Sequence, residues 1–264
     1  MSNVFQSTQD VLLHIEEGIA TVTLNKPQSR NSLSLQTLRE LHAAFTALDG
    51  DSCVRVVVLT ANGPAFSAGH DLKEVYAHSG DAVFYQELFH ACAETMKAIV
   101  RLPKPVIAKI RGVATAAGAQ LVASADLAYA AESARFATPG VNIGLFCSTP
   151  MVALSRNVAH KHALELLLSG DLFTAQHAAR IGLINRALPE DELDAAVDQL
   201  ACKIAAKSSV TLAIGKEAFY RQAELPLDDA YAYAAHIMVQ NLKHEDASEG
   251  ICAFLEKRTP VWRN

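Results

Sequence analysis

Residues 105–126 read Pro-Val-Ile-Ala-Lys-Ile-Arg-Gly-Val-Ala-Thr-Ala-Ala-Gly-Ala-Gln-Leu-Val-Ala-Ser-Ala-Asp. The β-branched run at 106–110 predicts a buried strand. Side chains are small over 112–119, and residues 120–125 favour a helix. Small residues at such a turn let a ligand approach the backbone, and the free N–H groups of the helix start suit an anion or a polarised carbonyl oxygen. Tight packing of a helix on a sheet would use the same residues, so this turn alone leaves both interpretations open.

A second stretch repeats this order of features. Residues 54–60 predict another buried strand, and residues 61–74 lead through small side chains to a helix start, with Asp71 in its first turn. One backbone N–H group from each loop could converge on a single oxygen. That geometry is an oxyanion hole, which stabilises the charge that develops when a thioester or ester becomes an enolate or a tetrahedral adduct. Losing one such donor costs roughly 3–4 kcal/mol of transition-state stabilisation.

Five motifs, in order along nearly the whole chain, resemble those of the crotonase superfamily, also called the enoyl-CoA hydratase/isomerase family. They lie at 24–33, 65–74, 105–126, 169–185 and 249–258. The second of them reads Ala-Phe-Ser-Ala-Gly-His-Asp-Leu-Lys-Glu. The resemblance implies an α/β fold, a crotonase-like spiral of ββα units with a helical C-terminal region. It also implies an acyl-CoA thioester whose carbonyl oxygen accepts from the backbone N–H groups of His70 and Ala117.

The same resemblance implies where coenzyme A binds. Relatives hold the adenine and pantetheine with backbone in two segments, which here supply Lys26, Arg30, Ser32, Ser67, Ala68, Asp71 and Leu72. Arg30 is a candidate partner for a phosphate, and so is Lys257, across a subunit interface. Either side chain is otherwise an ordinary solvated surface group. No cofactor is expected beyond coenzyme A as part of the substrate, and no metal, since His160 and His162 read as solvated residues at a helix start.

The acid–base groups depart from the pattern of the family's hydratases, in which two glutamates do this work. Gln120 stands at the first position and Gly140, in Ala-Thr-Pro-Gly, at the second. Glutamine does not titrate near neutral pH, and glycine offers only backbone. General acid–base catalysis is worth roughly 10²–10⁴-fold, so ordinary hydration should be crippled. Asn142 is a polar neighbour that could position water or a substrate carboxylate, with a plain turn role as the alternative.

Three functions therefore stay open. The first is enolate chemistry on an acyl-CoA by an enzyme of hydratase or isomerase type, a lyase or isomerase. The second is a decarboxylase or hydrolase of the same fold, since a similar Ser-Ala-Gly-His-Asp run occurs in methylmalonyl-CoA decarboxylase. Decarboxylation needs an electron sink more than a base. The third is a non-catalytic acyl-CoA binder, suggested by the two missing glutamates.

Composition bounds the class of protein. The 264 residues, 50% hydrophobic, supply a sizeable core. With 23 basic and 28 acidic residues the net charge is −5, and no Lys/Arg block favours a nucleic-acid partner. Five scattered cysteines indicate a reducing compartment. No apolar run reaches about 18 residues and no signal peptide is visible, so we expect a cytoplasmic protein without a membrane partner.

The order of elements predicts two regions. A hairpin at 11–24, a helix at 35–48 capped by Ser34, a long helix at 81–102 and strands at 127–130 and 135–137 belong to a spiral core, residues 1–188, with the acyl-CoA site. Helices are expected at 190–207, 210–223, 228–243 and 247–257. By resemblance, residues 189–264 form a trimerisation region, giving a homotrimer or a dimer of trimers.

Overall fold

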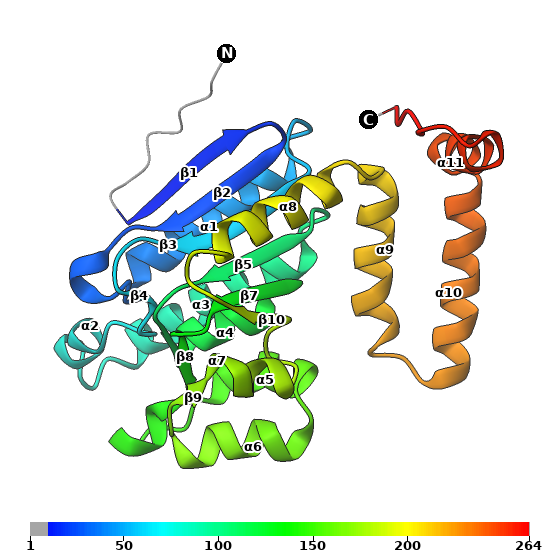
Figure 1. Ribbon diagram of the computed structural model, residues 1–264. Helices are drawn as coiled ribbons and strands as arrows, with labels where there is room; N and C mark the ends of the chain where they lie inside the picture. Colours follow the sequence, from blue (N-terminus) through cyan, green and yellow to red (C-terminus); the bar gives the residue numbers. More distant parts are fainter. Residues whose placement is uncertain (1–9, 264) are drawn as a thin grey trace.

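The computed structural model describes residues 10–263, and successive parts of the chain add strands to two sheets in turn (Figure 1). The strands are β1 (Val11–Glu16), β2 (Ile19–Leu24), β3 (Val56–Ala61), β4 (Ala65–Ser67), β5 (Val106–Ile110), β6 (Val113–Thr115), β7 (Leu127–Ala131), β8 (Arg135–Ala137), β9 (Phe173–Thr174) and β10 (Arg186–Leu188). The larger sheet has the order β1-β2-β3-β5-β7-β10, and the smaller one β4-β6-β8-β9. Each of β3, β5 and β7 joins the larger sheet, while the strand that follows it joins the smaller. The expected α/β spiral of ββα units is confirmed.

Eleven α-helices lie within the described residues. They are α1 (Leu35–Asp49), α2 (Leu72–Ala77), α3 (Ala82–Arg101), α4 (Ala117–Ser124), α5 (Ser148–Asn157), α6 (His160–Ser169), α7 (Ala175–Arg180), α8 (Leu193–Ala205), α9 (Ser209–Gln222), α10 (Leu227–Leu242) and α11 (Glu245–Glu256). The predicted N-cap of α1 is confirmed, because the Ser34 side chain accepts from the N–H of Thr37. Across 10–263, no helix combines the length and the apolar character needed to cross a bilayer.

The pairing follows the predicted strands closely. β1 and β2 form the expected antiparallel hairpin, and β2, β3, β5, β7 and β10 pair in parallel. The short strands β4 and β6 were not predicted, because small side chains give a weak strand signal. Their pairing sets Ala65 opposite Val113, which aligns the two loops that leave these strands.

Alternate residues of β3 serve two hydrophobic clusters. Val57 and Leu59 join the main core with α1 and α3, whereas Val56 and Val58 pack with residues of α8 on the opposite face. Helix α8 is therefore part of the core of the larger sheet, although it lies inside the predicted region 189–264. Helices α9 and α10 contain no buried residue and lie to one side of the sheets (Figure 1). The division after residue 188 stays a prediction.

A buried ion pair fastens α9 to the core. Lys216 Nζ lies 2.7 Å from Asp126 Oδ2, and the Lys216 side chain is only 7% exposed. One helical turn later, the Tyr220 hydroxyl donates to Asp126 Oδ1 at 2.9 Å. The carboxylate at the start of β7 thus holds two side chains of the same helix face.

Candidate active site

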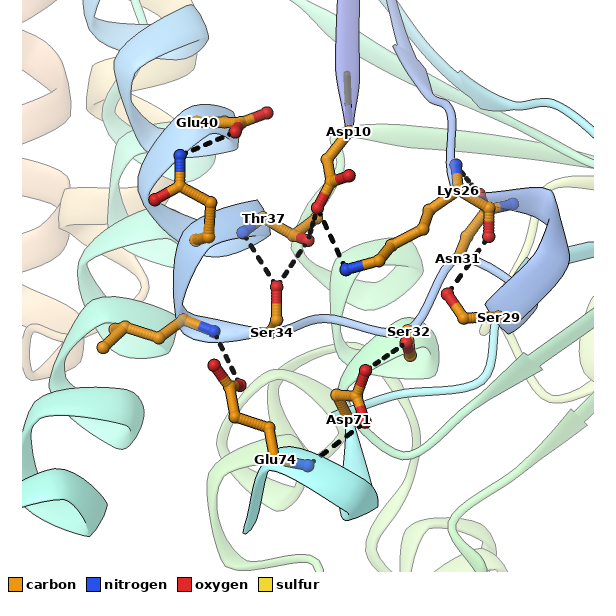
Figure 2. Close-up of polar contacts among 12 residues, drawn as sticks. Asp10, Lys26, Ser29, Asn31, Ser32, Ser34, Thr37, Glu40, Asp71 and Glu74 are labelled. Carbon is orange, nitrogen blue, oxygen red and sulfur yellow. Dashed lines mark hydrogen bonds and ion pairs between the residues drawn. The ribbon is translucent and has the colours of Figure 1, made fainter. Parts of the chain in front are cut away.

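Polar contacts from residues 26–35 hold the loop between β4 and α2 (Figure 2). Asp71 caps α2 by accepting from the N–H groups of Lys73 at 3.0 Å and Glu74 at 3.3 Å, and its other oxygen accepts from Ser32 Oγ at 3.0 Å. Glu74 Oε2 accepts from the N–H of Leu35 at 3.0 Å. Burial alone would raise the pKa of Asp71, but the bonds from Ser32 and the start of α2 outweigh it and lower that pKa. Asp71 therefore stays ionised and fixes the loop.

Asn31, which the sequence analysis did not single out, organises the first segment. It is buried in a left-handed conformation at φ 53°, and its Nδ2 donates to the carbonyls of Asn62 at 2.9 Å and Ala65 at 2.7 Å. Its Oδ1 accepts from the N–H of Lys26 at 2.7 Å. Lys26 Nζ is paired with Asp10 Oδ2 at 3.1 Å, so its side chain is engaged within the chain (Figure 2). The contact with coenzyme A predicted for Lys26 is one of its backbone, and the ion pair does not test it. The only sequence signal for this role of Asn31 is that asparagine adopts the left-handed backbone conformation more readily than most residues.

The second segment lies directly against the first. The N–H of Ala68 donates to the carbonyl of Arg30 at 3.0 Å, and the buried Ser67 Oγ donates to that of Asn31 at 2.8 Å. The Arg30 side chain is exposed, with no hydrogen bond or ion pair to the residues described. Leu72, the first residue of α2, is 53% exposed. The structure therefore brings the predicted contacts at 26–32 and 67–72 together.

Lys257 does not join them within one chain. It ends α11 in a left-handed conformation at φ 56°. Helix α11 and the 67–72 segment before α2 lie at opposite sides of the molecule (Figure 1). Any contact of Lys257 with this site would have to come from another copy of the chain.

The loops after β4 and β6 meet at Gly69. A Cβ on Gly69 would lie 2.8 Å from the Cβ of Ala116 and 3.2 Å from the nitrogen of Ala117. One residue into α4, a Cβ on Gly118 would lie 2.3 Å from the carbonyl oxygen of Ser67. Glycine at both positions is what allows the two backbones to touch.

The N–H groups of His70 and Ala117 make no hydrogen bond to any described residue. Ala117 is the first residue of α4, where N–H groups have no acceptor within the helix. His70 lies in a β-bridge with Leu33, but its own N–H takes no part in it. The N–H of Leu33 donates to the carbonyl of Gly69 at 2.8 Å, and the N–H of Asp71 donates to the carbonyl of Leu33 at 3.2 Å. Ala116, between the strand and the helix, has φ 49°, a conformation that side chains rarely adopt. Chemically, the junction offers two unpaired donors from adjoining loops.

Gln120 is turned toward α3. It is 4% exposed, and its Oε1 accepts from the Cys92 Sγ of that helix at 3.7 Å. Burial raises the pKa of the Cys92 thiol to about 12, so the sulfur keeps its proton and can only be the donor. The pair is neutral and holds no titratable group near neutral pH.

Gly140 is enclosed by the turn that follows it. It lies buried in the 3₁₀ turn η2 (Pro139–Ile143), where an added Cβ would lie 2.5 Å from the carbonyl oxygen of Leu145 and 2.9 Å from Cys147 Sγ. Burial raises the pKa of Cys147 and keeps it a thiol. Asn142 is exposed and directs its Nδ2 toward the carbonyl of Gly170, 3.5 Å away at the end of α6.

Three metal-type side chains gather elsewhere, at His162, Glu165 and His177, with candidate ligand atoms within 4.8 Å of one another. Arg180 donates to His177 Nδ1 at 2.7 Å. That bond puts a permanent positive charge against the group and leaves the neutral ring's proton on Nε2, so His177 is a poor metal ligand as it stands. His160 and His162 are exposed at the start of α6, as predicted.

Known proteins resemble this chain over nearly its whole length. The sequence model of a family described as enoyl-CoA hydratase/isomerase matches residues 14–264. Enoyl-CoA hydratase domain-containing protein 3, mitochondrial, of Xenopus laevis is 45% identical over 261 residues, 99% of this chain and 88% of that protein. A solved structure of an enoyl-CoA hydratase from Mycobacterium smegmatis has a TM-score of 0.94 and 49% identity, over 97% of this chain and 99% of that one. The human enoyl Coenzyme A hydratase domain-containing protein 3 has a TM-score of 0.93 and 44% identity, over 96% and 100%.

The expected cytoplasmic location is wrong by this comparison. Relatives from Xenopus laevis, Rattus norvegicus, Mus musculus and Homo sapiens, each 45% identical, are all named as mitochondrial. The expectation rested on the free cysteines together with the lack of a long apolar run and of a visible secretory signal peptide. Unpaired thiols indicate a reducing environment, and they do not distinguish one such compartment from another.

Proposed function

Because the chain belongs to the enoyl-CoA hydratase/isomerase family, we propose that it binds an acyl-CoA thioester and stabilises the enolate formed from it. The observation that carries the proposal is the junction of the two loops, with unpaired N–H groups at His70 and Ala117. A thioester oxygen there gains negative charge as the enolate forms. Fixed donors favour that charge over the neutral ground state, which is how they lower the barrier.

The surrounding backbone suits the rest of coenzyme A. Segments 26–32 and 67–72 adjoin one another, and the free Arg30 guanidinium is available for a phosphate. Lys257 joins this site only in an assembly. We propose a homotrimer or a dimer of trimers, supported by large exposed apolar side chains on α10 and α11, among them Tyr231, Met238, Leu242, Phe254 and Leu255. Light scattering on the purified protein tests this, and a monomer at all concentrations would contradict it.

We further propose that the protein is a poor hydratase. At neutral pH, Gln120 is an uncharged amide bonded to Cys92, and Gly140 has neither a side chain nor space for one. No base activates water and no acid protonates the α-carbon from these two positions. Hydration of crotonyl-CoA should be roughly 10²–10⁴-fold slower than in an enzyme with working acid and base. Turnover comparable to that of a two-glutamate hydratase would refute this part.

A second candidate function is decarboxylation or hydrolysis of an acyl-CoA. Decarboxylation is favoured by the uncharged residues at positions 120 and 140, since loss of carbon dioxide requires a sink for the electron pair and no general base. Incubation with malonyl-CoA and methylmalonyl-CoA, followed by chromatography, tests it. If hydration, decarboxylation and hydrolysis all fail while acyl-CoAs still bind, non-catalytic binding of acyl-CoA is the function that remains of the three.

Binding can be tested without altering the protein. An acyl-CoA is compared with its thioether analogue, in which a methylene group replaces the thioester carbonyl. Two hydrogen bonds at roughly 0.5–1.5 kcal/mol each predict that the thioester binds about 5–150-fold more tightly, measured by calorimetry. Equal affinities would show that the carbonyl oxygen is not held by the junction. Coenzyme A alone serves as the control for the nucleotide contacts.

A further inference from the structure

The imidazole of His70 is a polar group without a partner. Both ring nitrogens are shielded from solvent, and neither is hydrogen-bonded to any residue of 10–263. The ring packs edge-on against Phe89 of α3, with centroids 5.3 Å apart and planes at 84°. An unsatisfied buried polar group costs about 1–3 kcal/mol, and native proteins pair almost all of them. The Leu33 carbonyl lies close enough to the ring to favour its protonated form, but it makes no hydrogen bond of normal geometry with either nitrogen. Within the described residues the polarity of His70 is therefore not satisfied.

The ring lies beside the junction. It belongs to the residue whose N–H is proposed to bind the thioester oxygen, so it reaches only substrate atoms close to that carbonyl. Phe89 and Cys92 are three residues apart on α3 and share a face of that helix. The first contacts His70 and the second contacts Gln120. His70 and Gln120 thus contact the same face of α3.

The ring is neutral at physiological pH. Burial lowers the pKa of His70 and outweighs the nearby Leu33 carbonyl, which favours the protonated form. A neutral imidazole presents one N–H donor and one acceptor nitrogen. A hydroxyl or a keto oxygen satisfies such a group at little desolvation cost. A carboxylate would bring a charge into a shielded place that offers it no cation.

We propose that His70 is a specificity-determining residue, whose imidazole hydrogen-bonds an uncharged polar substituent on the α- or β-carbon of the bound acyl chain. The inference rests on the proposed acyl-CoA site. Unsubstituted acyl chains leave the imidazole unpaired, and carboxylated chains lose binding free energy because their charge is desolvated. Hydroxyacyl- and ketoacyl-CoA thioesters are the class of ligand that this residue selects.

Calorimetric titration of the full chain tests the selection. The probes are coenzyme A, butyryl-CoA, 3-hydroxybutyryl-CoA, acetoacetyl-CoA and malonyl-CoA. We expect the hydroxy and keto thioesters to bind about 10-fold more tightly than butyryl-CoA, as one hydrogen bond to an otherwise unpaired buried group predicts. In His70→Phe, which keeps an aromatic ring without polar atoms, the preference should vanish while coenzyme A binds as before. The matched control is His78→Phe, since exposed His78 stacks on Phe84 and should leave the preference intact.

The outcomes distinguish a failure of the role of His70 from a failure of acyl-CoA binding itself. Equal affinity of the wild type for butyryl-CoA and the polar thioesters would overturn the role of His70 and leave acyl-CoA binding standing. So would tightest binding of malonyl-CoA, or an undiminished preference in His70→Phe. No binding of coenzyme A or of any thioester would overturn the proposed function itself. Because equal affinities in the wild-type panel would already overturn the role of His70, the proposal can be refuted even if the variant does not fold.

Discussion

Replacing Lys216 by methionine should loosen the attachment of α9 to the core. The ammonium group has three N–H donors, and the structure uses all three: on Asp126 Oδ2 at 2.7 Å and on the carbonyls of Ile99 and Lys104 at 3.0 Å each. Methionine fills similar space and donates to none of them. The variant leaves the Asp126 carboxylate, only 16% exposed, without its cation and with hydrogen bonds from Tyr220 and the N–H of Val106.

The expected cost follows from this burial. Removing one partner of a buried ion pair destabilises a protein by about 3–5 kcal/mol, because the remaining charge is uncompensated. For a chain of this length that corresponds to a fall in Tm of roughly 6–10 °C. Burial lowers the pKa of Lys216 more than Asp126 raises it, so desolvation opposes the pair. The intact pair therefore contributes less net stability than its disruption removes.

A double-mutant cycle in urea measures the coupling. Lys216→Met, Asp126→Asn and the double variant are compared by circular dichroism, and the double variant should be clearly more stable than the sum of the single losses predicts. Lys203→Met, an exposed lysine near the end of α8, is the control and should change stability by less than about 0.5 kcal/mol. A loss below about 1 kcal/mol in Lys216→Met, or strict additivity, would refute the reasoning.

Three further changes test other parts of the structure. Gly118→Ala pushes a methyl group into the backbone of β4 and should cost about 1–3 kcal/mol, seen as a lower Tm and weaker acyl-CoA binding. Gly215→Ala, in the interior of α9 with open space around it, should instead stabilise by about 0.5–1 kcal/mol in the same melt. Arg111 lowers the pKa of Asp194 to about 2, so the carboxylate stabilises the fold above its ordinary pKa and the contribution is lost as pH falls toward 2. Asp194→Asn should therefore cost up to about 1 kcal/mol at pH 7, given the exposure of the pair, and clearly less at pH 2 in urea titrations.

Local patterns made much of the fold predictable. The apolar spacing of 35–48 and the Ser34 cap define α1, whose buried face is the one that the spacing indicates. The β-branched runs define β3 and β5 in the same way. Strands β4 and β6 escaped prediction because their pairing is decided by contact between distant segments. Their small residues carry little local preference of their own.

The candidate site was predictable in its location and less so in its contacts. Glycine-rich turns and the family resemblance indicated residues 67–72 and 112–120. The bond from the N–H of Leu35 to Glu74 and the pairing of Lys26 with Asp10 depend on side chains far apart in sequence. Lys216 reads as a solvated lysine until the fold places it on Asp126, 90 residues away. Long-range polar pairs of this kind have no signature in a single sequence.

The turn that closes over Gly140 has a consequence for protein engineering. Any side chain at this position meets the carbonyl of Leu145 and the sulfur of Cys147, whatever its charge. A designer who wished to install a carboxylate here would first have to graft a different connection between η2 and α5. Installing a working acid at position 140 thus requires replacement of the loop and not only a single substitution.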